Sequence, residues 1–206
     1  TDPDDEVLIP DPGFVSYEPI VKMAGAIPKP VPNYEKDNFK LRPDEIEKKI
    51  TKKTKIIIIN SPANPTGSVL EKSDLEAIAE IAQKRNILIL SDEVYEKLIY
   101  EGKHYSIGSI SDKVITINSF SKTYAMTGFR IGYLVAPEEL IDPLLKVHQY
   151  LTACASSVAQ KAALAALTGP QDFVKNMKKE FKERRDLIVN GLNKIGFDCK
   201  KPKGAF

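Results

Sequence analysis

Three polar segments directly follow apolar runs of the chain, and they contain side chains that could do chemistry. Asn64 lies in the first segment, Asp92 and Tyr95 lie in the second, and Lys122 lies in the third. In an open α/β sheet, ligands bind at the edge formed by the carboxyl ends of the strands. We therefore expect an amide, a carboxylate, a phenol and a primary amine to converge at one edge of a sheet.

Each of these side chains alone has an ordinary structural explanation. Residues 64–67 read Asn-Pro-Thr-Gly, which is typical of a tight turn. An aspartate after a strand often caps the next helix, and a lysine in a serine-rich loop is usually solvated. Together they match the needs of pyridoxal phosphate. Its aldehyde needs a lysine amine, and its ring nitrogen needs an anion. Its phenolate needs hydrogen-bond donors, and its phosphate needs hydroxyls and a cation.

Four motifs in a fixed order make the chain recognisable. They are Asp-Pro-Gly-Phe-Val-Ser-Tyr at 11–17, Asn-Pro-Thr-Gly at 64–67, Ser-Asp-Glu-Val-Tyr at 91–95, and Ser-Phe-Ser-Lys at 119–122 followed by Gly-Phe-Arg-Ile-Gly at 128–132. In these motifs the chain resembles, along essentially its whole length, the class I/II aminotransferases of the fold-type-I pyridoxal-phosphate enzymes. The resemblance implies a three-layer α/β/α fold with a mostly parallel mixed sheet. It also implies a transferase of amino acid metabolism that moves an amino group between an amino acid and a 2-oxo acid.

The resemblance implies catalytic roles for three residues. Lys122 would hold pyridoxal 5'-phosphate as a Schiff base and, once released, move a proton between the substrate α-carbon and C4′ of the cofactor. Asp92 would pair with the pyridinium nitrogen. Tyr95 would hydrogen-bond the phenolate oxygen of the cofactor together with Asn64.

Four further residues are expected to contact the cofactor. Ser119 and Arg130 would bind its phosphate, since arginine suits bidentate contact. Ser121 would assist them, or would only cap the turn. Phe14 would lie against the ring face, with a place in the hydrophobic core as the alternative.

Four other residues receive no role in this interpretation. Tyr17 is expected to pack against the helix that follows it. Glu93 is expected to point away from the ring and to cap a helix or face solvent. His104 and His148 fit no metal-ligand spacing, so no metal site is predicted.

The hydrophobic pattern predicts the elements that must position these side chains. Strands are expected at residues 7–9, 56–59, 87–90, 114–117 and 131–135. Helical patterns alternate with these runs, which is typical of a layered α/β domain. Ser73 and Glu76 predict a capping box for a helix that Asn86 ends.

Further helices are predicted to begin at Pro137 and at Ser157, the second capped with Gln160 and ended by Gly169. A last, long helix carries one apolar stripe, which consists of Phe173, Met177, Phe181, Ile188, Leu192 and Ile195. We expect residues 1–170 to form a cofactor-binding domain. Residues 171–206 would form a connecting helix and the start of a smaller domain.

Composition excludes several classes of partner. The net charge of +2 gives no electrostatic reason to expect nucleic acid. No apolar run approaches the ~18 residues of a membrane span, and the two cysteines form no CxxC motif, which fits a reducing cytoplasm.

The resemblance implies a homodimer. The absent initiator Met and the ending at Gly-Ala-Phe lead us to expect a piece of a longer protein, inactive by itself.

Two alternative functions stay open at this point. The chain could be a pyridoxal-phosphate-dependent lyase of the same superfamily, or an aminotransferase-like sensor domain of a transcription regulator. A phosphate-loop nucleotide site at residues 67–73 is excluded because Glu71 stands where a glycine is required. The substrate is equally open among aspartate, aromatic, kynurenine and alanine types. Leu151 stands where some aspartate-specific relatives place an arginine, but others use different residues.

Overall fold

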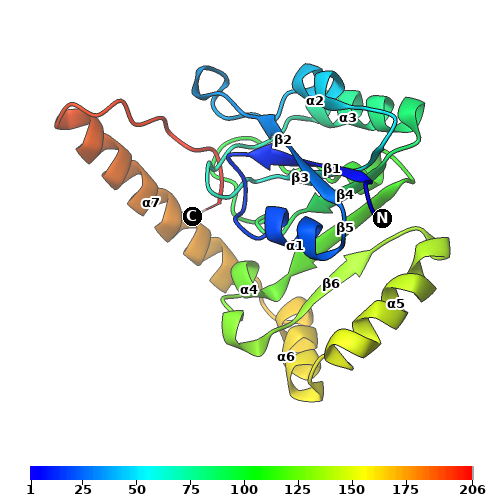
Figure 1. Cartoon of the computed structure of the whole chain (residues 1–206). Helices are drawn as coiled ribbons and strands as arrows, with labels where there is room; N and C mark the ends of the chain where they lie inside the picture. Colours follow the sequence, from blue (N-terminus) through cyan, green and yellow to red (C-terminus); the bar gives the residue numbers. More distant parts are fainter. Residues whose placement is uncertain (206) are drawn as a thin grey trace.

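Six strands form one sheet in the order β2-β1-β3-β4-β5-β6 in the computed structural model, which describes residues 1–205 (Figure 1). The strands are β1 (Glu6–Asp11), β2 (Ile27–Pro32), β3 (Thr54–Asn60), β4 (Leu88–Asp92), β5 (Val114–Ser119) and β6 (Gly132–Val135). The first five run parallel, and β6 pairs antiparallel with β5. The predicted mixed, mostly parallel sheet is confirmed.

Helices cover both faces of this sheet, as the isoleucine run of β3 requires. Ile57 and Ile59 pack on one face with α2 (Pro43–Lys49) and α3 (Lys72–Arg85). Ile58 points to the opposite face, where α1 (Tyr17–Met23) lies. Successive side chains of a strand alternate between faces, so a strand covered on both sides is apolar throughout. Burying each such side chain contributes roughly 1.5–3 kcal/mol. The result is the three-layer arrangement that was predicted.

Strand β2 was not predicted, because its sequence Ile-Pro-Lys-Pro-Val-Pro contains three prolines. The strand is at the edge of the sheet and pairs only with β1. The amide of Ile27 donates to the carbonyl of Asp5, just before β1, and the amide of Asn33 donates to the carbonyl of Asp11, at the end of β1. Alternate residues share a side of a strand, so Pro28, Pro30 and Pro32 have their nitrogens on the outer side. Proline is tolerated there because no partner strand needs the missing N–H.

Helix α3 begins earlier than predicted. Its N-cap is Glu71, which forms a capping box with Asp74, so the predicted box of Ser73 and Glu76 is wrong. A contact from a distant loop accompanies this cap, since Lys40 Nζ donates to Asp74 Oδ2 at 2.9 Å. The predicted end of the helix is confirmed, because Asn86 adopts the left-handed conformation there.

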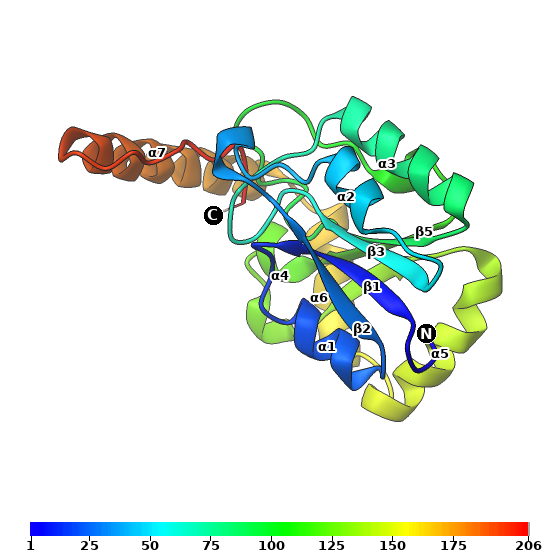
Figure 2. The ribbon, with the colours of Figure 1, turned by 45° about the horizontal axis from the view of Figure 1, so that its top comes forward.

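The chain then continues through α4 (Phe120–Thr123) and three longer helices. These are α5 (Glu138–Thr152), α6 (Ser157–Thr168) and α7 (Asp172–Lys194). The N-cap of α6 is Ser156, without a side-chain cap bond, and Gln160 donates instead to the carbonyl of Ala155. The predicted cap by Ser157 is therefore wrong. Helix α7 projects away from the sheet and from the helices that cover it, as both views show (Figures 1 and 2).

The predicted apolar stripe of α7 is only partly correct. Phe173, Ile188 and Ile195 are exposed, whereas Val174 and Val189 are buried. Met177 and Phe181 do pack against a buried cluster formed by Tyr95, Leu98 and Ala205. Helix α7 contacts the rest of the protein along only part of its length. Its buried face is therefore set by these contacts and not by its most apolar stripe.

Two kinds of feature are absent from residues 1–205. No helix there is long and apolar enough to cross a membrane. The same residues contain no group of three or more His, Cys, Asp or Glu side chains placed to hold a metal ion.

Candidate active site

The three polar segments meet at the carboxyl edge of the sheet, as expected from their strands. Asp92 ends β4, and its register partners are Asn60 at the end of β3 and Ile117 on β5. Asn60 Nδ2 donates to the carbonyl of Asp92 at 2.9 Å, which fixes the two strand ends together. Helix α4, which carries Lys122, follows β5 directly. The parallel order of the sheet therefore brings together residues that lie far apart in the sequence.

Asp92 is largely enclosed and accepts two hydrogen bonds. Tyr17 Oη donates to Oδ2 at 2.6 Å, and the amide of Val94 donates to Oδ1 at 3.3 Å. Burial raises the pKa of the Asp92 carboxyl, while the bonds from Tyr17 and Val94 act in the opposite direction. The two bonds leave further acceptor positions on the carboxylate, which offers about four lone-pair sites. Asp92 can therefore accept another donor at this edge.

Tyr17 is a site residue that the sequence interpretation missed. Its ring does pack beside α1, as expected, but its hydroxyl reaches Asp92 across 75 residues of sequence. Burial and the charge of Asp92 both raise the pKa of Tyr17, so the phenol stays protonated and donates. The only available signal was its place in the motif at residues 11–17, because hydrophobic periodicity explains a tyrosine there equally well.

Phe14 lies next to Tyr17 and is not a core residue. Its ring is 40% exposed, and the two rings meet edge to face with centroids 5.6 Å apart. The alternative of a core position for Phe14 is therefore wrong. The exposed ring is available for contact with a bound molecule.

Asn64, Tyr95 and Lys122 converge beside Asp92. Asn64 Nδ2 donates to Tyr95 Oη at 3.3 Å, and the Asn64 amide donates to Asn60 Oδ1 at 2.7 Å. Burial raises the pKa of Tyr95, with the bond from Asn64 opposing it, so the hydroxyl stays protonated. Lys122 Nζ lies 5.9 Å from the centroid of the Tyr95 ring. The predicted amide, phenol and amine thus share one place.

The predicted phosphate-binding residues lie in the loop around α4. Ser119 is the N-cap of α4 and accepts from the amide of Ser121 at 3.1 Å, so Ser121 is not the cap. Ser119 Oγ also lies 3.3 Å from the carbonyl of Ile131. Arg130 is exposed, adopts a left-handed conformation, and donates from Nη1 to the carbonyl of Thr127 at 2.9 Å. Ser119, Ser121 and Arg130 thus all lie in the segment that runs from the end of β5 to the start of β6.

Glu93 is placed differently from the expectation. It is 3% exposed, so a solvent-facing position is wrong. Its carboxylate contacts Ser91, His104 and Ser106. His104, to which no role was assigned, is thus part of a buried polar cluster one residue away from Asp92.

The chemistry of these donors fits pyridoxal phosphate. An enclosed carboxylate could accept from a ring N–H, and a protonated phenol with an amide could donate to a phenolate. A primary amine lies beside them, and the segment that carries this amine also contains two serine hydroxyls and a guanidinium. A hollow of about 910 Å³ lies elsewhere, between α7 and the turn at residues 65–69, and Asp92, Tyr95 and Lys122 do not line it. We place the site by its chemistry, because perturbed titratable groups converge there.

Known proteins with similar sequences are aminotransferases. A family model described as aminotransferase class I and II matches residues 1–206. A probable aspartate aminotransferase of Methanocaldococcus jannaschii is 52% identical, with 98% of this chain and 55% of the relative covered. An aromatic-amino-acid aminotransferase 2 of Thermococcus litoralis is 48% identical, with 98% of this chain and 54% of the relative covered.

A solved structure shows the same fold. The crystal structure of an aromatic aminotransferase from Pyrococcus horikoshii OT3 superposes with a TM-score of 0.97 at 46% identity. The superposition covers 100% of this chain and 57% of that one. The chain spans about half the length of the curated relatives it matches.

Proposed function

We propose that the whole protein is a pyridoxal-phosphate-dependent aminotransferase, because the chain belongs to the aminotransferase class I and II family. It would move an amino group between an amino acid and a 2-oxo acid. The observation that carries the proposal is the convergence of Asp92, Tyr95 and Lys122 at one sheet edge. Relatives of similar identity are named aspartate and aromatic aminotransferases, so we propose these two types of amino donor for the assay.

Pyridoxal phosphate, when bound, supplies an aldehyde that reacts with amines and a protonated ring that withdraws electrons from the substrate α-carbon. In our proposal Asp92 accepts the ring N–H and so keeps that proton on the ring. Tyr17 donates to the same carboxylate and holds it in one orientation. This electrostatic arrangement favours negative charge developing at the α-carbon.

Lys122 would act at two points of the reaction. Its Nζ would bind the aldehyde carbon of the cofactor and later, once released, hold the proton taken from the substrate α-carbon. Tyr95 Oη and Asn64 Nδ2, which already contact each other, would donate to the phenolate oxygen. Both donors are fixed before any ligand binds, which lowers the cost of ordering them.

The loop around α4 would bind the phosphate. Ser119 and Ser121 would donate from their hydroxyls, and Arg130 would pair with phosphate oxygens through its planar fork of donors. Phe14, with its exposed ring, would lie against one face of the cofactor.

We also propose that the protein is cytoplasmic and forms a homodimer. Residues 1–170 would belong to the cofactor-binding domain, and residues 171–206 would begin a smaller domain. Both cysteines, Cys154 and Cys199, are free, which fits a reducing compartment. Apolar side chains such as Tyr150 and Leu151 on α5 are exposed, and large apolar patches mark contact surfaces. The extension of α7 beyond the sheet layers supports the division into domains (Figure 2).

Covalent labelling tests the proposed function. The full-length protein is incubated with pyridoxal phosphate, reduced with borohydride and digested, and the phosphopyridoxyl mass is located. We expect it on the peptide that contains Lys122, and we expect Lys122→Ala to lose the label and nearly all turnover. Label only on Lys103 or Lys113 would contradict the assignment.

An assay of glutamate, aspartate and phenylalanine with 2-oxoglutarate or oxaloacetate then tests the reaction. Label at Lys122 without amino transfer would favour a lyase or a sensor. Running the isolated 206-residue chain in parallel tests whether it is inactive by itself, as we propose. Comparable turnover from both would place the whole substrate site within these residues.

A further inference from the structure

The carboxylate of Glu93 is buried next to the site, and three side chains hold it. Ser91 Oγ and Ser106 Oγ each donate to Oε1 at 2.9 Å. His104 Nε2 lies 2.8 Å from Oε2. A carboxylate only accepts, so the imidazole donates from Nε2. Glu93 therefore has hydrogen-bond partners on both of its oxygens.

Fold stability alone does not explain this cluster. Taking a carboxylate out of water costs free energy, and its partners offset that cost only when their geometry is good. Replacing such buried charged groups by well-packed apolar side chains is often neutral or stabilising. The burial of Glu93 is therefore weak evidence that its carboxylate serves stability. The segments that Glu93 contacts indicate its role.

Glu93 ties the end of β4 to two other parts of the fold. Its amide donates to the carbonyl of Ile117 on β5 at 2.9 Å, and its own carbonyl accepts from the amide of Glu96 at 2.9 Å. Its side chain reaches His104 and Ser106, which precede the short helix η2 (Ile107–Ser109). The turn at residues 92–96 is therefore anchored on both sides through this one residue.

The same turn carries two residues of the proposed site. Asp92 precedes Glu93 directly and accepts from the amide of Val94 within the turn. Tyr95 follows two residues later and contacts Asn64. Rotation of the turn would therefore move the carboxylate and the phenol together. A shift of about 1 Å from a change far from the chemistry can cost on the order of a hundredfold in rate.

We propose that Glu93, held by Ser91, His104 and Ser106, is a positioning residue that fixes the Asp92 carboxylate and the Tyr95 phenol toward the cofactor. It acts through the turn and does not touch the cofactor. This inference rests on the proposed function. Burial is the main cause of the raised pKa of Asp92, and the negative charge of Glu93 adds to it, so the two carboxylates also act on each other electrostatically.

The test compares Glu93→Gln with Glu96→Gln in the full-length protein. Glutamine keeps the shape of glutamate, but its NH2 group cannot accept, so at least one of the three donors loses its acceptor. Glu96 lies in the same turn, half-buried, and its ion pair is with the exposed Lys97, which makes it a matched control.

We expect Glu93→Gln to weaken pyridoxal phosphate binding about tenfold and to lower kcat by roughly ten- to a hundredfold with little change in KM. The pH midpoint of the visible absorbance of the bound cofactor should shift as well. Glu96→Gln should leave all three quantities as in the wild type. His104→Gln retains an N–H donor and should preserve more function than His104→Ala.

Two outcomes would overturn the proposal. One is a folded Glu93→Gln protein whose cofactor affinity, kcat and absorbance midpoint all equal those of the wild type. If Glu93→Gln does not fold, Ser106→Ala and His104→Ala each remove a single donor, and wild-type values in both would equally overturn it.

Amide hydrogen exchange on the cofactor-free protein separates this proposal from the proposed function. Glu93→Gln should speed exchange at the amides of Glu93 and Glu96, which bond across the turn. Unchanged exchange would contradict a positioning role. If the wild type bound no pyridoxal phosphate, the proposed function would fail, while the exchange result would still decide what Glu93 holds.

Discussion

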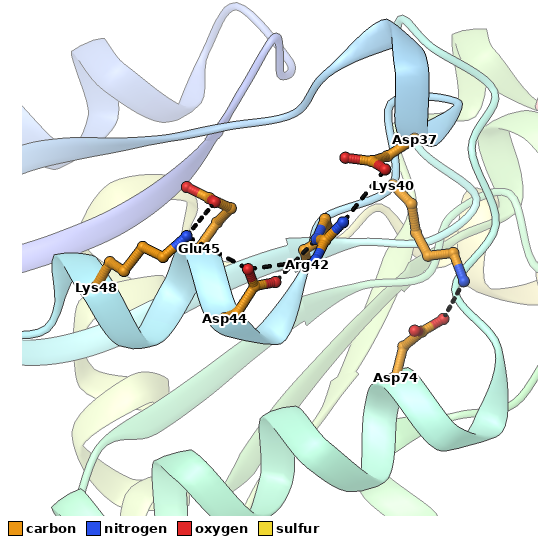
Figure 3. Close-up of polar contacts among 7 residues, drawn as sticks. All are labelled: Asp37, Lys40, Arg42, Asp44, Glu45, Lys48 and Asp74. Carbon is orange, nitrogen blue, oxygen red and sulfur yellow. Dashed lines mark hydrogen bonds and ion pairs between the residues drawn. The ribbon is translucent and has the colours of Figure 1, made fainter.

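Two regions of the molecule are rich in polar contacts between side chains, and they differ in what surrounds them. Around α2, Arg42 contacts Asp37 and Asp44, while Lys48 contacts Glu45 (Figure 3). Most of these side chains are solvent-exposed. Water and salt compete with such contacts, so they contribute little to stability.

At the carboxyl edge of the sheet the polar contacts are enclosed. Tyr17 bonds Asp92 at 2.6 Å, and Glu93 is held by two serines and a histidine. Burial raises the pKa of both Tyr17 and Asp92, whereas the hydrogen bond from Arg42 lowers the pKa of the exposed Asp44. The difference teaches that the number of ion pairs does not locate a site. Burial of the polar groups and their convergence locate it.

The largest expected effect belongs to Asp92. Asp92→Ala removes the partner of the ring nitrogen, and we expect kcat/KM to fall about a thousandfold or more, at ~1.4 kcal/mol per tenfold. Asp92→Glu keeps the charge and should be milder. Steady-state kinetics of the full-length protein check this. Near-normal turnover in the alanine variant would reduce Asp92 to a structural residue.

Tyr17→Phe is expected to have the next largest effect, because it removes one hydrogen bond and keeps the packed ring. A hydrogen bond to a charged group contributes roughly 1.5–3 kcal/mol, so we expect kcat/KM to fall roughly ten- to a hundredfold. Burial raises the pKa of Asp92, and in the wild type the hydrogen bond from Tyr17 partly opposes that increase. Without this bond the pKa of Asp92 should rise further. Carboxyl-labelled NMR of the cofactor-free protein should show the increase, and an unchanged Asp92 titration would separate Tyr17 from the site.

A smaller effect concerns stability against pH. The folded state raises the pKa of Asp92 above its ordinary value, so the folded state binds more protons between the two values. Stability from this group is therefore lost as pH rises through that window, by about 1.4 kcal/mol per unit of pKa difference. In the cofactor-free protein, Asp92→Asn should become more stable relative to the wild type as pH increases there. Thermal midpoints of both proteins across the carboxyl range measure this, and parallel curves would argue against it.

Asp44→Asn is expected to have the smallest effect. It removes the exposed contacts of Asp44 to Arg42 and Lys48 in the α2 region. Thermal midpoint and turnover should both equal those of the wild type, since water replaces the lost contacts. A clear loss of stability would break the contrast between the two regions.

The position of the site could be predicted from the sequence, because local patterns show where strands end and a parallel sheet brings those ends together. Asp92 ends a strand, Asn64 and Lys122 lie shortly after strands, and parallel neighbours place those strand ends at one edge. Sequence reasoning did not reach Tyr17 or His104. Each is ordinary in its own segment and gains a role only from a partner distant along the chain or buried beside it.

The errors in the secondary structure have the same origin. Two overlapping pairs, Glu71 with Asp74 and Ser73 with Glu76, could each begin α3, and Lys40 contacts the pair that the structure uses. The prolines of β2 argue against a strand until the strand is known to be at the edge of the sheet. Local propensity predicts secondary structure only weakly, and tertiary contacts decide between the alternatives that it leaves.

The sequence by itself determined the α/β architecture, the position of Asp92 and Lys122 at or just after strand ends, and the family to which the chain belongs. Those features follow from short-range hydrophobic patterns and motifs. The tertiary structure alone decided that Tyr17 bonds Asp92, that Glu93 is buried, and which face of α7 is covered. The physical reason is that burial and hydrogen-bond partners are properties of distant segments brought together, and no local pattern specifies them.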